Sequence, residues 1–191
     1  MVAMSENDAD VVDLLVSQHG QIKHATERVL RSSGPDKLDS FRDLVRLLAV
    51  HEAAEEEVIH PAARQHSVSD EVVDRRLQEE RQAEHMLAEL YEIGVQHQDF
   101  DAKFRVFAEG VTEHTEREEK EEFGPLLLHA SQVERVRLAR VVRFAEAIAP
   151  TSPYVRVGES AMANLLTGPP LGLFDRLRNA IRDARIQSRE A

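Results

Sequence analysis

Apolar residues recur at intervals of three and four along most of this 191-residue chain, which is the period of one buried face of an α-helix. The clearest run steps from Val12 through Leu15, Val16 and Ile22 to Val29. No stretch has the alternating, β-branched pattern between turn residues that would indicate a strand. The chain is therefore predicted to be all-α.

Turn-forming residues divide this pattern into four long helices. Gly34 and Pro35 separate the first helix from the second, and Ser69 or Asp70 begins a third that runs to about Gly94. The fourth helix closes around residues 124–125, a Gly-Pro pair. Long helices with short connections favour an antiparallel, up-and-down four-helix bundle, and we assign residues 8–130 to it.

Two further segments come after the predicted bundle. Residues 131–149 are expected to form an additional amphipathic helix that packs on the bundle. Residues 150–191 read as an irregular linker followed by a basic amphipathic helix at about 171–187. The short apolar face of that helix favours docking on the acidic bundle or on a second subunit over a position at a membrane surface. A homodimer formed through this arm is accordingly a candidate assembly.

Composition excludes several classes of function. The chain has 35 acidic and 24 basic residues and a formal net charge of −11, which disfavours nucleic acid as a partner. No apolar run is long enough for a membrane span, and residues 1–15 lack the basic and apolar parts of a secretory signal. Without cysteine there is no disulfide, thiolate metal site or cysteine nucleophile. The expected protein is cytoplasmic and works with histidines, carboxylates, hydroxyls or a cofactor.

The sequence His-x-x-x-Glu-Glu occurs twice, beginning at His51 and at His114, with a proline ten or eleven residues after each histidine. Residues four apart on a helix point in nearly the same direction, so His51 pairs with Glu55 and His114 with Glu118. Both pairs lie on apolar stripes, where an uncompensated carboxylate costs about several kcal/mol to bury. A dication bound by imidazole nitrogen and carboxylate oxygen removes this cost.

The two other helices also carry histidines. His19 interrupts the apolar stripe of the first helix and lies 32 residues before His51, while His85 lies in the third helix, 29 residues before His114. A histidine followed by His-x-x-x-Glu on the next helix thus occurs twice. This repetition predicts a pseudo-twofold bundle around a central two-metal cluster.

Glu52 is a further candidate ligand, because it lies about 100° around the helix from His51, with Glu55 between them. Glu55 can then bridge two ions while His51 and Glu52 each bind one. A bundle without metal is the alternative, since His-Glu pairs four apart are also ordinary helix-surface chemistry. That alternative predicts that His114→Ala leaves stability nearly unchanged, whereas a metal-coupled fold loses stability and ion together.

Other metal and catalytic motifs do not match. A zincin requires a second histidine where this chain has Glu55. Ferritin-like di-iron bundles use two Glu-x-x-His motifs, and the chain offers only Glu57-Val-Ile-His60. No Gly-x-Ser-x-Gly sequence of a hydrolase nucleophile elbow occurs.

The spacing of these residues resembles the hemerythrin-like (HHE cation-binding) domain, bacterial type, over about residues 8–130. The elements that carry the resemblance are His19, His51-x-x-x-Glu55-Glu56 with Pro61, Glu84-His85, and His114-x-x-x-Glu118-Glu119 with Pro125. The resemblance implies a four-helix bundle that holds two iron ions joined by an oxo or hydroxo bridge. The residues it implies as metal ligands are His19, His51, His85 and His114, with Glu55 and Glu118 as bridging carboxylates and Glu52 on the second iron.

The chain departs from oxygen-carrying members of that family. They have a second histidine one turn before the third-helix ligand, where this chain has Arg81, and an aspartate where it has Glu118. More carboxylate and less imidazole favours Fe(III), so simple reversible O₂ carriage is not expected. Arg81 is predicted either to hydrogen-bond a bridging carboxylate or bound peroxide, or to form an ordinary ion pair with Glu80 or Glu84.

The resemblance implies a protein that binds or reacts with O₂, hydrogen peroxide or nitric oxide, in an oxidative-stress response. Catalase-like or peroxidase-like turnover would make it an enzyme. The alternatives are a metal-dependent sensor or regulatory protein without turnover, in which residues 150–191 contact a partner, and an iron buffer. The sequence leaves these alternatives open.

Overall fold

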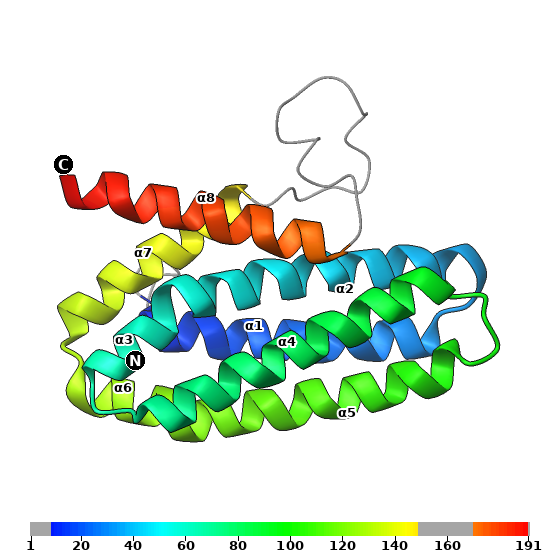
Figure 1. Cartoon of the computed structure of the whole chain (residues 1–191), viewed down its shortest axis with the longest axis horizontal. Coiled ribbons are helices and arrows are strands. Elements are labelled where there is room, and N and C mark those ends of the chain that lie inside the picture. Colours follow the sequence, from blue (N-terminus) through cyan, green and yellow to red (C-terminus); the bar gives the residue numbers. More distant parts are fainter. Residues whose placement is uncertain (1–8, 149–169, 191) are drawn as a thin grey trace, which may run out of the picture.

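The computed structural model describes residues 9–148 and 170–190, and every regular element in that part of the chain is helical (Figure 1). Four long helices run side by side as an antiparallel bundle, as the sequence predicts. The elements, with η marking a π-helical turn, are α1 (Val11–Arg31), α2 (Gly34–Ala54), η1 (Glu55–Ile59), α3 (His60–Gln65), α4 (Asp70–Ile93), α5 (Phe100–Glu118), η2 (Glu119–Phe123), α6 (Gly124–His129), α7 (Gln132–Ile148) and α8 (Pro170–Glu190). The predicted irregular linker falls outside the described residues.

Local sequence signals set the ends of the bundle helices. The Asp10 side chain accepts hydrogen bonds from the backbone N–H groups of Val12 and Asp13, which forms a capping box at the start of α1. Pro35 lies in the first turn of α2, where a missing N–H has no intrahelical partner to lose. Gly94 ends α4 with a φ of 73°, a left-handed backbone that glycine adopts without steric cost.

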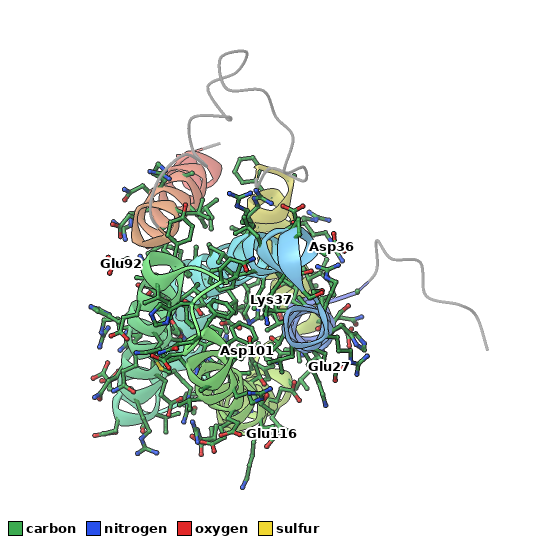
Figure 2. The ribbon with its side chains drawn as sticks, turned by 90° about the vertical axis from the view of Figure 1, so that its right-hand side faces the viewer. Glu27, Asp36, Lys37, Glu92, Asp101 and Glu116 are labelled. Atoms are coloured by element: carbon green, nitrogen blue, oxygen red, sulfur yellow. The ribbon has the colours of Figure 1, made fainter. Side chains whose placement is uncertain are left out.

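The starts of α2 and α5 meet in an aromatic core. The rings of Phe41 and Phe100 contact edge to face at 5.3 Å, and Phe100 stacks on Phe104 at 5.6 Å. Lys37 donates to Asp101 at 2.5 Å and closes this end of the bundle, which faces the viewer in Figure 2. The apolar packing of this half leaves the other half of the bundle for the buried histidines and carboxylates.

Two more helices lie outside the four-helix bundle. Helix α7 packs on α1 and α2, whereas α8 packs on α2 and α4 and also contacts α7. Seen along the bundle, both lie on the same side of it, above α2 and α4 (Figure 2). The buried apolar face of α8 consists of Leu173, Phe174, Leu177 and Ile181.

Arginines of α8 contact acidic residues around the end of α2. Arg178 forms ion pairs with Glu56 and with Glu84 of α4, and Arg182 pairs with Glu57 at 2.5 Å. The basic helix therefore docks on the bundle, one of the two placements that its composition favoured. No helix in the described part of the chain is long and apolar enough to cross a membrane.

The packing of α8 can be tested by removing its central aromatic side chain. Phe174 is fully buried, so Phe174→Ala is expected to destabilise the protein by about 3 kcal/mol in urea unfolding followed by circular dichroism. Leu128→Ala, at a side chain that is 81% exposed, is the control and should change stability by less than about 0.5 kcal/mol. Equal effects of the two substitutions would show that α8 does not pack on the bundle in solution.

Candidate metal centre

Both His-x-x-x-Glu-Glu helices widen into a π-helical turn that begins within the last two residues of the motif, at Glu55 and at Glu119. The backbone N–H of His60 bonds to the carbonyl of Glu55, and that of Gly124 bonds to the carbonyl of Glu119, each five residues back. A proline comes directly after each of these donors. Because a proline ring clashes with the carbonyl four residues earlier, an α-helix cannot continue unchanged there. The wider turn admits the proline and lets the helix run on.

The π turn changes which side chains face the interior. One extra residue in a turn rotates all later residues of the helix by about 100° relative to an unbroken α-helix. His60, five residues after Glu55, is thereby buried at 1% exposure, and Glu122 and Phe123 are buried beyond Glu118. The inward positions of His60 and Phe123, each five residues after a glutamate of the centre, cannot be derived from a regular 3.6-residue period, whereas Glu122, four residues after Glu118, can.

The bundle interior brings three groups of metal-ligating side chains together, each with its ligand atoms within 4.8 Å of one another. The groups are His19, His51, Glu55 and Glu118; Glu55, Glu80 and His114; and His60, Glu118 and Glu122. Glu55 and Glu118 each belong to two groups. A carboxylate with one oxygen toward each of two ligand sets is suited to bridge two ions.

The imidazole and carboxylate atoms that face one another have no hydrogen-bond partners. This holds for the Nε2 atoms of His19, His51 and His114 and for both carboxylate oxygens of Glu55 and Glu118, all buried. Buried polar atoms are nearly always hydrogen-bonded. An unpartnered set that converges on one point is the arrangement that a bound cation satisfies.

The other ring nitrogen of each histidine is held in place. Carboxylate or amide oxygens accept from the Nδ1 atoms at His19–Glu119 (2.8 Å), His51–Gln18 (2.7 Å) and His114–Glu79 (3.1 Å). A hydrogen on Nδ1 leaves the lone pair on Nε2, where a metal binds, and metal-bound histidines are usually oriented by such an acceptor. Phe123 stacks on the His19 ring at 5.5 Å and further fixes its plane.

Distances within the set suit a small dication. Nε2 of His51 lies 3.0 Å from Oε1 of Glu55, and Nε2 of His19 lies 3.4 Å from Oε2 of Glu118 and 3.7 Å from Oε1 of Glu55. Nε2 of His114 lies 3.8 Å from Oε2 of Glu118. A first-row ion holds such ligands at about 2.0–2.2 Å, so two ligands of one ion are about 3–4 Å apart. The residues present therefore fit a metal.

Without metal, protons must balance the two buried carboxylates. Burial opposes ionisation of Glu55, yet His51 and His19 keep its pKa well below the ordinary range. Burial, together with the neighbouring Glu55, raises the pKa of Glu118 to about 8. Burial alone would lower the pKa of His19, but Glu118 and Glu55 raise it to about 10. The centre accordingly holds protons at neutral pH that a cation would replace.

The third group is already compensated by side chains. His60 contacts Glu122 through Nδ1 at 2.8 Å and Glu80 through Nε2 at 2.6 Å, so neither ring nitrogen is unpartnered. Burial opposes its charge, but these carboxylates raise the pKa of His60 well above its usual value. Arg76, fully buried, pairs with Glu121 at 2.9 Å beside Glu122. These contacts make an ion network beside the centre, and the first two groups remain as the metal candidates.

Comparison with known proteins agrees with this geometry. The sequence profile of the hemerythrin HHE cation-binding domain matches residues 10–126. The chain belongs to the hemerythrin HHE family. Among solved structures, a hemerythrin HHE cation-binding domain-containing protein from Mycobacterium kansasii has a similar fold, with a TM-score of 0.65 and 17% identity over 82% of this chain and 98% of that chain. No curated protein matches the chain. The protein is therefore a metal-binding helical protein of the hemerythrin HHE family.

The structure brings most of the predicted hemerythrin-like ligands to one place. Those in the first two groups are His19, His51, Glu55, His114 and Glu118. Glu52 is buried next to them but belongs to none of the three groups. Its pKa is raised well above the ordinary value by burial and by Glu80 and Glu84.

His85 and Arg81 do not reach the centre. Both are exposed, and the ring Nδ1 of His85 lies 2.6 Å from the backbone carbonyl of Arg81. The reason is helical phase: Val73 and Leu87 of α4 are buried, and His85, two positions before Leu87, lies about 200° away from that face. The expected contact of Arg81 with a bridging carboxylate is therefore corrected.

Glu80 occupies the third-helix position that the sequence assigned to His85. It lies seven residues after Val73 and seven before Leu87, on the buried face of α4. One turn earlier the inward residue is Arg76, in place of Arg81. The sequence contains a signal for Glu80, because a glutamate at the spacing of an apolar stripe indicates a buried carboxylate. A histidine is the more usual metal ligand, and the prediction therefore fell on His85.

The contact that orients His19 is expected to tune metal affinity. Glu119→Ala removes the acceptor on Nδ1 and should weaken cation binding about tenfold, because partners of metal-bound histidines typically contribute that much. Competition with a chelator measures the affinity. Glu109→Ala, at an exposed glutamate of the same helix, is the matched control, and equal affinities of the two variants would contradict the role of Glu119.

Metal affinity is also expected to rise with pH. At pH 7 the metal-free protein holds protons on His19 and Glu118, whose pKa values are raised to about 10 and about 8, and a cation must displace them. Binding should therefore be at least about tenfold tighter at pH 8 than at pH 6. Glu118→Gln, which lacks one of the displaced protons, should show a shallower pH dependence in the same chelator titration. An affinity that does not change with pH would exclude this competition.

Proposed function

We propose that the protein holds two iron ions and that this centre binds and reacts with a small oxidant, namely O₂, hydrogen peroxide or nitric oxide. The observation that carries the proposal is the place of Glu55, which belongs to both candidate ligand sets. Glu118 belongs to the first set, and its Oε2 lies 3.8 Å from Nε2 of His114 in the second. All four oxygens of these two carboxylates lack hydrogen-bond partners. One set adds His19 and His51, and the other adds Glu80 and His114.

The donor chemistry supports iron. The two sets together offer imidazole nitrogens and carboxylate oxygens, which suit iron among the first-row metals. Three carboxylates, those of Glu55, Glu80 and Glu118, place more negative charge on the ions than an all-histidine site would. Anionic oxygen ligands stabilise Fe(III), the state that an oxidant produces. The chain has no cysteine that an oxidant could modify beside the centre.

The protein's own residues have three tasks in this chemistry. A pair of iron ions, when bound, supplies two electrons to an oxidant. Glu119, Gln18 and Glu79 fix the tautomer and direction of the three imidazoles. The Phe123 ring covers His19 and keeps bulk water from that side.

The third task, holding Glu80 in place, belongs to the ion network beside the centre. His60 holds Glu80 through a 2.6 Å contact and so keeps this carboxylate turned to the interior. It also ties Glu80 to Glu122 on the opposite helix. The second oxygen of Glu80 remains unpartnered and is free to face an ion.

A regulatory role without turnover is the second candidate, and the contacts of α8 favour it. Arg178 pairs with Glu56, directly after Glu55, so the C-terminal helix touches the segment that carries a bridging carboxylate. A change at the centre can reach α8 through this pair. Deleting residues 150–191 separates the candidates: an enzyme keeps its peroxide chemistry, whereas a sensor loses its response or its partner.

The proposal is tested by an anaerobic iron count followed by titration with O₂, hydrogen peroxide and nitric oxide, monitored by absorption. Two ions per chain are expected, with a charge-transfer band after oxidation. His114→Ala should lose about one ion and the band, while His85→Ala, at an exposed histidine on α4, should keep both. A count of one or no iron per chain, or a complete centre that reacts with none of the three, would refute the proposal.

A further inference from the structure

A cavity of about 260 Å³ opens beside the candidate metal centre, between α4 and α5. We name it the α4–α5 chamber. Four residues of the centre and its surroundings form part of its lining: His51, Glu52, Glu80 and His114. A molecule inside the chamber therefore meets the centre directly.

The rest of the chamber wall combines apolar side chains with the polar residues Gln82 and Thr115 and with three charged residues that pair with one another. Leu48 of α2, Met86 of α4, and Phe107 and Val111 of α5 line it, with Ile22 contributed by α1. Methionine is flexible and adapts to differently shaped ligands. Contact between such a wall and a hydrocarbon ligand makes the free energy of binding more favourable, by roughly 25 cal/mol per Å² of apolar surface removed from water.

The chamber is larger than O₂ or hydrogen peroxide needs. Water occupies about 30 Å³ per molecule in the liquid, so 260 Å³ corresponds to roughly nine non-hydrogen atoms. A much smaller cavity would be sufficient for a centre that bound only diatomic ligands or hydrogen peroxide. The volume matches a small organic molecule.

Charges at the chamber mouth are paired with one another. Arg117 contacts Glu79 at 3.3 Å and Glu113 at 3.3 Å, and Glu79 also accepts from His114 at 3.1 Å. The buried Nε of Arg117 has no hydrogen-bond partner, but four glutamates line the same chamber, so an anionic ligand meets a net negative wall. A cationic ligand would have to leave water for a largely apolar space. The inner wall, in contrast, offers a buried oxygen of Glu52 that has no hydrogen-bond partner. One polar group at the end of an apolar ligand would meet it.

We propose that the α4–α5 chamber binds a small uncharged organic molecule of about nine or ten non-hydrogen atoms in all, an apolar body that carries one hydroperoxide group. The apolar body lies against Leu48, Met86 and Phe107, and the head group lies toward Glu52 and the metal-facing side of His114. The choice of a hydroperoxide as the head group rests on the proposed function. The binding of an apolar molecule that carries one polar oxygen does not depend on that function.

A second cavity, of about 270 Å³, lies on the other side of α5, against α1. It also reaches the centre, at His19, but its lining has only three apolar side chains, those of Val16, Ile22 and Val111. Threonines and charged residues, among them Lys23 and Glu119, make up most of the rest. It suits water and ions better than hydrocarbon. Each cavity has one helical glycine in its lining, so the same substitution can be made in either. A substitution in the second cavity is therefore the control for one in the α4–α5 chamber.

Gly110 lines the α4–α5 chamber and Gly20 lines the second cavity, and a Cβ atom at either position meets nothing within 4 Å. Both are exposed helical glycines, so Gly110→Phe and Gly20→Phe should fold normally, which circular dichroism and thermal unfolding verify. The added ring is expected to obstruct only the cavity that its own glycine lines.

The test uses 2-phenyl-2-propanol, an uncharged and unreactive alcohol of ten non-hydrogen atoms, in ligand-observed NMR titrations of the metal-free and the iron-loaded protein. We expect the wild type and Gly20→Phe to bind it and Gly110→Phe to bind at least about tenfold more weakly. A carboxylate analogue, 2-phenylisobutyrate, should not compete in the metal-free protein. Absence of binding to the wild type, equal binding to both variants, or competition by the carboxylate would overturn the proposal.

Kinetics of the protein loaded with Fe(II) under anaerobic conditions test the head group. Two Fe(II) ions would supply the two electrons that cleave the O–O bond of the hydroperoxide, and with two protons the products are an alcohol and water. The matching hydroperoxide, cumene hydroperoxide, should react about tenfold more slowly with Gly110→Phe than with the wild type, whereas the reaction with hydrogen peroxide should change less than about twofold. Equal slowing of both would overturn the assignment of the substrate class. If the protein binds no iron, the proposed function fails, and the alcohol titration of the metal-free protein still decides on the chamber.

Discussion

Two buried glutamates that face each other, Glu55 and Glu118, are the constraint on which the rest of the structure depends. Two ionised carboxylates in an apolar interior repel each other and lose hydration, so the bundle must supply positive charge or protons. Histidines from three helices surround the pair, and the pKa of Glu118 rises to about 8 through burial and Glu55. Bound cations compensate the same charge and give the imidazole lone pairs a partner.

The surroundings of the centre are shaped by this constraint. Acceptors on the three Nδ1 atoms turn the histidines toward the carboxylates. The π turns let the same helices add His60 and Phe123 beside the centre. The prolines that require those turns, Pro61 and Pro125, follow Glu55 and Glu118 by six and seven residues. The same π turns therefore distort the helices and help to build the site. π turns are frequently found at functional sites.

The sequence was sufficient to predict the inward His-Glu pairs that begin on α2 and α5. It was not sufficient to predict which residues of α4 face the interior. His51 with Glu55 and His114 with Glu118 are four apart, so a regular helix places each pair on one side whatever the tertiary packing. His85 has no such partner, and its direction depends on which face of α4 the core selects. The buried positions Val73 and Leu87 select the face that carries Glu80, and His85 points away.

By itself the sequence determined an all-α bundle, four apolar stripes and two His-x-x-x-Glu pairs within them, because helical period and i,i+4 geometry are local properties of the chain. Only the tertiary structure decided that Glu80 joins the centre, that His60 and Arg76 compensate charge beside it, and that a chamber opens between α4 and α5. Those features depend on the rotation of each helix about its own axis and on the extra residue in each π turn. Both are set by packing against neighbouring helices.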